Sequence, residues 1–334
     1  MLKGIGRSMK NILQIAIASG KGGTGKTSLA VALAKSLALS KEKTLKQKEI
    51  YLADCDVEEP NANLFFSTYF SEEKKETKKY PTSLERVDVP IPQINHELCT
   101  LCGKCVEFCQ FNALARVGRV LVFDELCHSC GGCTLVCPTK AITEVAHSIG
   151  SKTQKTLPHK EKDIHFIEGK LDVGKALSPP IIRNVKKTLA EKTKDKSAII
   201  ILDSPPGASC PMTTTIDAVD FVVLVTEPTP FGLHDLKIAV ETVRQVGYPF
   251  GVVINRSDAG DSRVLEYCES EKIPVLLEIK EDMDIAKAYS IGKSIVETKS
   301  EYIDLFIDLY KKIEELVEKK NIFQKPAITT GVKI

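Results

Sequence analysis

The 334-residue sequence has almost no excess charge and no long apolar segment. Its 46 lysines and arginines nearly balance 44 aspartates and glutamates, and the net charge of +2 provides no basic surface for nucleic acid or anionic lipid. No uninterrupted apolar run approaches the length of a membrane span, and the first residues lack the apolar core of a signal peptide. We therefore expect a cytoplasmic protein with neither nucleic acid nor a membrane as its partner.

Cysteine is the residue type that stands out. The chain has 11 cysteines, and eight of them fall in one short segment. Because a reducing compartment does not sustain structural disulfides, this clustering indicates metal ligation. The length allows two domains, or one large domain that carries an insert. Residues 1–10 and 325–334 are expected to be a peripheral leader and tail.

A glycine-rich loop organises the first part of the sequence. The octet Gly20-Lys21-Gly22-Gly23-Thr24-Gly25-Lys26-Thr27 lies between an apolar run, 12–18, and a helical pattern, 28–39. Strand, loop and helix in this order form a P-loop, in which glycines bring backbone N–H groups close to a phosphate. We expect Lys26 to reach the outer phosphates of ATP and the Thr27 hydroxyl to hold Mg²⁺. The predicted nucleotide-binding residues here are Gly22, Gly23, Thr24, Gly25, Lys26, Thr27 and Ser28.

Several later apolar runs end in polar residues. Asp54-Cys55-Asp56 follows the run 50–53, and Asp203-Ser204-Pro205-Pro206-Gly207 follows the run 198–202. Carboxylates at the carboxyl ends of strands lie where an α/β sheet binds its ligand. More apolar runs follow at 221–225, 250–254 and 274–277, separated by helical patterns such as 233–246. Because these runs are continuous rather than alternating, they predict a mostly parallel sheet flanked by helices.

The clustered cysteines form a repeated motif. Cys99-x2-Cys102-x2-Cys105-x3-Cys109 recurs as Cys127-x2-Cys130-x2-Cys133-x3-Cys137-Pro138, the bacterial ferredoxin spacing for two [4Fe-4S] clusters. In that arrangement the fourth cysteine of each motif ligates the other cluster. The expected ligand sets are Cys99, Cys102, Cys105 and Cys137 for one cluster, and Cys127, Cys130, Cys133 and Cys109 for the other. A Zn(Cys)4 site is the competing interpretation, but it would leave four of these cysteines without a role.

This motif divides the chain into parts. We expect an inserted ferredoxin domain at 92–146, preceded by a charged connector at 71–91. The P-loop ATPase domain is then discontinuous, comprising 1–70 and 147–334. The fold expected is an α/β P-loop NTPase with a mostly parallel sheet, carrying a bacterial-type 2[4Fe-4S] insert.

The octet and the strand-end motifs together resemble those of the MinD/ParA superfamily of P-loop ATPases, which includes Mrp-type iron-sulfur carriers and the nitrogenase iron protein. The resemblance implies a homodimer with two ATP molecules at its interface, in which Lys21 reaches into the partner's site. It also implies that Asp56 orients the attacking water in switch I and that Asp203 binds a water on Mg²⁺. The predicted catalytic residues are thus Lys21, Lys26, Asp56 and Asp203.

The same resemblance assigns further nucleotide contacts. Gly207, in switch II, would offer its N–H to the γ-phosphate, and Asn255 with the adjacent Arg256 would contact the adenine end. The usual Ile-Pro-x-Asp segment is Ile279-Lys280-Glu281-Asp282 here, which leaves the base contacts in that segment open. MinD ends in a membrane-binding amphipathic helix, but the apolar stripe at 302–317 favours a helix packed on the sheet.

Three cysteines lie outside the repeat. Cys55 lies within the switch I motif and Cys210 follows switch II, and the resemblance implies that such a pair from each subunit could bind a shared metal or a transient cluster across a dimer. The alternative is that they are small thiols with no chemical role. Cys268 lies in a patterned helix and is expected to pack in the core.

Three functions fit these observations. The first is an ATP-dependent electron carrier that delivers electrons to a partner redox protein. The second is an ATP-dependent carrier that assembles an iron-sulfur cluster or passes it to an acceptor protein. The third is a positioning ATPase whose clusters are structural. Eight ligands committed to two clusters favour permanent redox centres, and therefore the first function.

Overall fold

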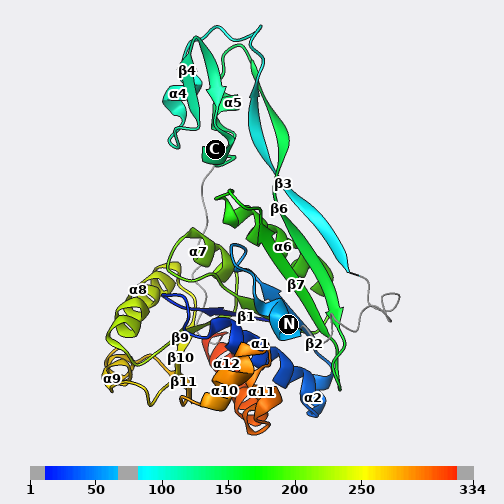
Figure 1. The fold of residues 1–334 in the computed structure, drawn as a ribbon, viewed down its shortest axis with the longest axis vertical. Coiled ribbons are helices and arrows are strands. Elements are labelled where there is room, and N and C mark those ends of the chain that lie inside the picture. The colour runs from blue at the N-terminus through cyan, green and yellow to red at the C-terminus, as the bar shows by residue number, and fades with distance from the viewer. Residues whose placement is uncertain (1–11, 67–81, 322–334) are drawn as a thin grey trace, which may run out of the picture.

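A nine-stranded sheet with helices on both faces forms the body of the molecule, and a two-stranded ribbon carries a small lobe away from it (Figure 1). The computed structural model describes residues 12–66 and 82–321. Seven adjacent strands run parallel to one another, in the spatial order β11 (Val275–Ile279), β10 (Phe250–Asn255), β9 (Phe221–Thr226), β1 (Ile12–Ala18), β8 (Ala198–Asp203), β2 (Glu49–Asp54) and β7 (Ile164–Leu171). The predicted α/β fold with a mostly parallel sheet is confirmed.

Alternate side chains of the central strands fill two separate cores. Ile15 and Ile17 of β1 face one core, and Ala16 and Ala18 face the other. The first core is covered by α1 (Lys26–Leu39), α2 (Lys43–Lys46), η1 (Ala62–Phe66), α10 (Met283–Ser290), α11 (Ile295–Thr298) and α12 (Glu301–Asn321). The second is covered by α6 (Ser178–Thr193), α7 (Cys210–Ile216), α8 (Pro230–Val246) and α9 (Arg263–Ser270). Burial on both faces explains why these strands read as continuous apolar runs.

Helix α12 packs its apolar stripe into the first core. Phe306, Tyr310 and Ile313 are at most 1% exposed, which confirms the interpretation of this segment as a core helix. In the part of the chain that the structure describes, no helix is both long and apolar enough to cross a membrane.

The ribbon consists of β3 (Ser83–Ile94) and β6 (Ile142–Leu157), which pair antiparallel along their length. β6 also pairs antiparallel with β7, so the ribbon joins the edge of the sheet. We expected residues 71–91 to be a charged connector. The part up to 81 lies outside the described residues, but 83–91 are strand. The many charges concealed the alternating Val87, Val89 and Ile91, which are buried.

The lobe at the end of the ribbon contains few regular elements. They are α4 (Lys104–Phe108), the hairpin of β4 (Leu114–Val117) and β5 (Arg119–Val122), η2 (Asp124–Leu126) and α5 (Gly132–Val136). Its small core combines cysteines with Leu114, Val120 and Ile142. So small an apolar core leaves much of the lobe's stability to other interactions.

Candidate nucleotide site and two cysteine cavities

The loop between β1 and α1 has the geometry of an anion site. Gly23 and Gly25 adopt φ of 78° and 93°, values that glycine reaches without strain. The backbone N–H groups of Gly22 to Gly25 donate no hydrogen bond to any described residue. A Cβ at Gly22 or Gly23 would meet no atom within 4 Å. Unused backbone donors at the start of a helix, with open space beside Gly22 and Gly23, are an arrangement that binds phosphate.

Lys26, Asp56 and Asp203 share one electrostatic environment. Lys26 is 6% exposed, and burial lowers its pKa, while Asp203 and Asp56 act to raise it. Burial raises the pKa of Asp203 to about 7, opposed by the nearby Thr27 hydroxyl and by Lys26. The pKa of Asp56 rises to about 6 for the same reason. Three of the four predicted catalytic side chains, Lys26, Asp56 and Asp203, therefore lie close together near the carboxyl ends of β1, β2 and β8.

Some buried oxygens of this site lack partners. Within residues 12–66 and 82–321, neither carboxylate oxygen of Asp203 has a hydrogen-bond partner of ordinary geometry, and the same holds for Thr24 Oγ1. Leaving such groups unpaired costs free energy unless a ligand or its hydration water satisfies them. The donor set thus fits a nucleotide with a hydrated cation: Thr27 and Asp203 are oxygen donors of the kind that Mg²⁺ prefers.

Asp54 organises the loop after β2, which we call switch I (residues 55–61). Its carboxylate accepts hydrogen bonds from the N–H groups of Asp56, Asn61 and Ala62 at 3.1, 3.0 and 3.0 Å. Asp54 is fully buried and pairs in register with Asp203, so burial first and then this neighbouring charge raise its pKa. The sequence motif contained Asp54, but only the structure shows that it positions Asp56.

Glu227, at the end of β9, holds two predicted nucleotide-site cations. Its carboxylate lies 3.5 Å from Lys21 Nζ and 3.2 Å from Arg256 Nη1. Lys21 is therefore paired within its own chain in this structure. A role for Lys21 in a partner's site would require it to leave Glu227. We had not selected Glu227 from the sequence; its position directly after a buried strand was the available signal.

Two further predicted contacts are engaged inside the chain. The Gly207 N–H donates to the Ser19 carbonyl at 3.0 Å, so switch II (residues 204–207) must move before Gly207 can meet a phosphate. Asn255 Nδ2 donates to the Thr24 carbonyl at 2.9 Å. Asn255 thus braces the P-loop. In the segment 279–282, for which the sequence left the base contacts undecided, Asp282 caps α10 and pairs with Lys299.

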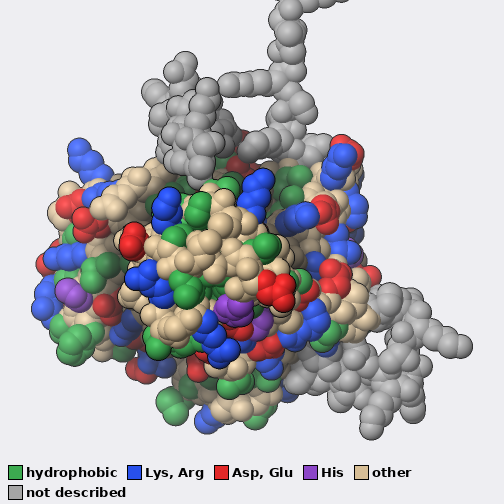
Figure 2. Space-filling model, turned by 90° about the horizontal axis from the view of Figure 1, so that it is seen from above, with side chains coloured by type: hydrophobic (Ala, Val, Ile, Leu, Met, Phe, Trp, Pro, Cys, Tyr) green, Lys and Arg blue, Asp and Glu red, His purple; other side chains and the backbone are tan. Residues whose placement is uncertain are grey.

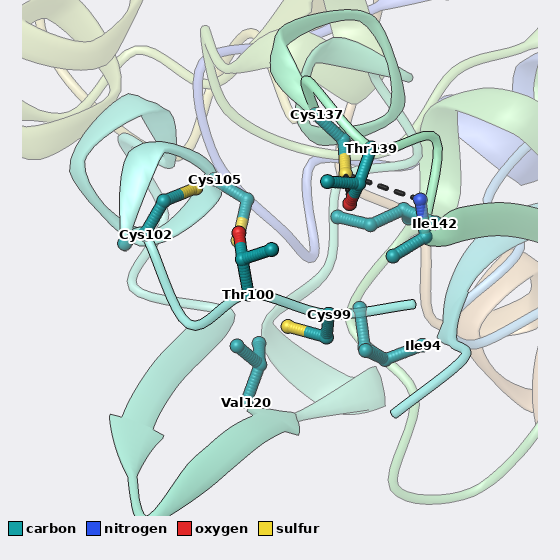
Figure 3. A pocket seen from close by; sticks show the side chains of 11 residues that line it. Ile94, Cys99, Thr100, Cys102, Cys105, Val120, Cys137, Thr139 and Ile142 are labelled. Carbon is teal, nitrogen blue, oxygen red and sulfur yellow. Dashed lines mark hydrogen bonds between the residues drawn. The ribbon is translucent and has the colours of Figure 1, made fainter. Parts of the chain in front are cut away.

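In the lobe, one cavity contains the first predicted ligand set. Cys99, Cys102, Cys105 and Cys137 line it together with apolar side chains such as Ile94, Val120 and Ile142. Figure 3 shows these sulfur atoms facing a common space from different sides. Cys137 Sγ accepts a hydrogen bond from the Ala141 N–H at 3.3 Å. The fourth cysteine therefore comes from the second motif, as the ferredoxin spacing predicts.

A second cavity contains the other set. Cys109, Cys127, Cys130 and Cys133 line it, together with Pro90 and Pro92 of β3. Cys127 Sγ accepts from the Ser129 N–H at 3.4 Å. Both crossed sets of four thiols are thus brought together, one to each cavity. No three His, Cys, Asp or Glu side chains among the described residues are grouped closely enough to hold a single metal ion.

The remaining cysteines differ in exposure. Cys55 is fully buried in the second core, and burial raises its pKa far above the usual range. It is therefore unsuited to the interface metal site that we considered. Cys210 is exposed at the start of α7, and Cys268 is buried as expected.

Seen from the lobe end, the surface shows lysines, arginines and acidic residues interspersed, with no large area of one charge sign (Figure 2).

The chain shares its fold and part of its sequence with known proteins. The CobQ/CobB/MinD/ParA nucleotide binding domain matches residues 15–295. Uncharacterized protein MJ0578 of Methanocaldococcus jannaschii is 31% identical over 306 residues, 92% of this chain and 98% of that one. An iron-sulfur cluster carrier protein of Aquifex aeolicus is 29% identical over 138 residues, 36% of this chain and 38% of that one. The structure of the septum site-determining protein MinD of Pyrococcus horikoshii, complexed with Mg-ADP, superposes on this chain with a TM-score of 0.53. The match covers 92% of this chain and 98% of that chain at 17% sequence identity, so the likeness is one of fold.

The raised pKa of Asp203 predicts a pH-dependent contribution of this carboxylate to stability. The folded state binds this proton up to about pH 7, whereas the unfolded chain releases it near 3.8. Between these values the folded state holds more protons, so the group's contribution to stability falls as pH rises. Asp203→Asn should therefore have a larger free energy of unfolding than wild type at pH 8, and a clearly smaller advantage at pH 5, where the unfolded chain has released this proton but the folded state still holds it. Urea unfolding without nucleotide measures both; a variant less stable at pH 8 would contradict this. The exposed Asp308→Asn should behave as wild type.

Proposed function

The chain belongs to the CobQ/CobB/MinD/ParA family of nucleotide-binding domains, and from this membership we propose that it is a Mg²⁺-dependent ATPase that couples nucleotide turnover to electron transfer through two [4Fe-4S] clusters. One observation carries the proposal. The two complete cysteine sets line separate cavities in a lobe whose ribbon belongs to the same sheet as the P-loop. A single folded body therefore joins the two kinds of site.

In the nucleotide site, each residue has a distinct role. The N–H groups of 22–25 and Lys26 bind the phosphates, and Thr27 supports the cation. Asp203, whose ionised form a bound cation would stabilise against burial, would help to hold the hydrated Mg²⁺. Asp56, held by Asp54, orients the attacking water. Lys21 completes the site of a second copy after it leaves Glu227, so the active form is a homodimer with ATP at its interface.

In the lobe, the eight thiols of the two cavities would hold the clusters. When bound, [4Fe-4S] groups accept and release single electrons at low potential. The N–H groups of Ser129 and Ala141 already donate to the sulfurs of Cys127 and Cys137. Such hydrogen bonds stabilise thiolate charge and are one of the protein's means of setting a potential. The exposed Cys102 and Cys130 place each set within reach of a partner redox protein at the lobe surface.

A cluster-carrier function is the second candidate. The partial similarity to the Aquifex aeolicus iron-sulfur cluster carrier protein and the exposed Cys210, next to switch II, favour it. A third candidate is a positioning ATPase with structural clusters. Its support is the fold likeness to MinD. The apolar stripe of α12 is buried in this chain, so that helix offers no free apolar face to a membrane.

The two P-loop lysines should have separable effects. Lys26→Ala removes a buried cation from the phosphates and should weaken ATP binding by at least about tenfold. Lys21→Ala should leave binding nearly unchanged but slow hydrolysis on the order of 10²-fold, because its charge acts on the transition state across the dimer. Equilibrium binding of labelled ATP and steady-state phosphate release distinguish these effects. Equal loss of ATP binding in both variants would refute the role of Lys21 in a partner's site.

The cysteine sets predict the iron content. Anaerobically purified protein should contain about eight iron atoms per chain, and Cys130→Ser or Cys137→Ser should each remove about four. Cys268→Ser, a change at a buried cysteine outside both cavities, is the control and should keep the full content. Iron analysis with EPR of the reduced protein checks this. Wild-type protein that contains zinc and no iron would contradict the cluster assignment.

Electron transfer and cluster transfer can be separated in one assay. Reduced holoprotein is mixed with a low-potential dye or with an apo-ferredoxin, each with and without ATP. The electron-transfer proposal predicts that ATP accelerates reduction of the dye while iron stays with the protein. Iron appearing in the apo-ferredoxin at the expense of the protein would favour the carrier function. Lys26→Ala serves as the control for any effect of ATP itself.

A further inference from the structure

We propose that helix α6 is the element that transmits nucleotide-dependent movement of both switches to the ribbon and its lobe, through Ser178, Lys186 and Thr188. This inference rests on the proposed function and identifies how the two sites communicate. Within the described residues, α6 contacts both ribbon strands, β3 and β6, and it also contacts β7 and α7. Figure 1 shows α6 lying along β6 and β7 with α7 beside it. Its three contacts with the switches and the ribbon are separate.

The first contact is with switch I. Ser178, at the start of α6 and 1% exposed, donates its hydroxyl to Glu58 Oε1 at 2.6 Å. Beside it, Val57 packs so closely on Gly169 of β7 and on α6 that a Cβ at Gly169 would lie 2.8 Å from Val57 and 2.9 Å from Ile181. Movement of the residues next to Asp56 therefore displaces α6 or breaks these contacts.

The second contact is with the segment after switch II. Helix α7 begins at Cys210, soon after Gly207. Lys186 Nζ, from α6, donates to the Thr214 and Thr215 carbonyls at 3.0 and 2.9 Å and also to the Asp217 carbonyl. A cation at the carboxyl end of a helix satisfies carbonyls that have no partner within the helix. A movement of switch II that displaces α7 must therefore either carry α6 with it or break these hydrogen bonds.

The third contact is with the ribbon. Lys152 of β6 is 5% exposed; its Nζ donates to Thr188 Oγ1 at 2.6 Å and lies 3.0 Å from Glu85 Oε2 of β3. Thr188 thus fastens α6 to both strands of the ribbon through a single buried ammonium. Close to this point, a Cβ at Gly150 would lie 2.5 Å from Ile181 Cδ1. α6 and the base of the ribbon are in direct contact.

Along the ribbon, β6 also links the lobe to the body. His147 Nε2 is 2.9 Å from Lys175 Nζ, just before α6, and His147 Nδ1 is 4.0 Å from Asp124 of the lobe. A closely packed helix moves as a unit and shifts between discrete arrangements. Since α6 contacts switch I, the helix α7 that follows switch II, and the ribbon, it lies on a continuous series of packed groups between the nucleotide site and the cysteine cavities.

Hydrogen exchange of the holoprotein in the ADP and ATP-analogue states tests this transmission. In wild type, the amides of β3 and β6 near Thr188 should differ in protection between the two states. Thr188→Val removes the hydrogen bond to Lys152 of the ribbon with little change of side-chain shape. It should reduce the difference in amide protection between the two states about fivefold, because the net contribution of one hydrogen bond corresponds to about that factor. ATP hydrolysis should remain near the wild-type rate, because Thr188 does not touch the nucleotide site.

Further variants separate transmission from simple destabilisation. We call the nucleotide-dependent difference in ribbon protection the response. Lys186→Met should reduce the response as Thr188→Val does, and Lys186→Arg, which keeps a hydrogen-bond donor, should retain much of it. Lys187→Met, on the exposed side of the same helix, is the matched control and should not alter the response. Ser178→Ala should weaken only the contribution from switch I.

Two results would overturn the proposal: wild-type protection of the ribbon that is independent of nucleotide, or an unchanged response in both Thr188→Val and Lys186→Met. Neither depends on the electron-delivery assay. ATP-stimulated dye reduction without a ribbon response would leave the proposed function in place and remove α6 from it. A ribbon response without any ATP-stimulated dye reduction would support the role of α6 and contradict the proposed electron-transfer function.

Discussion

The structure depends on how one buried ammonium is surrounded by carboxylates at the end of a parallel sheet. Lys26 is buried between the strand ends that supply Asp56 and Asp203, and burial shifts each of these groups toward its neutral form. The charges of these three groups are removed from water and only partly compensate one another, which costs free energy. Phosphates and a hydrated cation supply the missing charges and donors. The free energy thereby gained on binding is available to move the switches.

The strand order explains how the chain carries the lobe without disturbing this arrangement. β3 and β6 join the sheet beyond β7, at the edge away from β9 to β11, so the parallel strands around the P-loop keep their neighbours. An edge position also suits the sequence of β3. Pro90 and Pro92 cannot donate to a further strand, and its charged residues discourage pairing with another sheet. The lobe is therefore carried on a ribbon that does not interrupt the nucleotide site.

The sequence was sufficient for the central part of the fold because burial on both faces leaves a simple signal. The runs 12–18 and 198–202 became β1 and β8 with at most one residue of difference. The cysteine spacing was sufficient to predict which four thiols share each cavity. The ribbon could not be predicted, because its strands are exposed on one face and the charged residues between Val87, Val89 and Ile91 suggested a solvated connector. Pairings such as Glu227 with Lys21, or Lys186 with the carbonyls of α7, join residues distant in sequence, and no local pattern indicates them.

The central claim is that phosphate chemistry and cluster chemistry act within one mechanical unit. The most direct measurement is the reduction potential of the clusters in anaerobic holoprotein, determined by EPR-monitored titration in nucleotide-free, ADP-bound and ATP-analogue-bound states. The account predicts that at least one potential shifts between these states in wild type and that the shift is absent in Lys26→Ala. Identical potentials in all three states, with nucleotide shown to be bound, would contradict it.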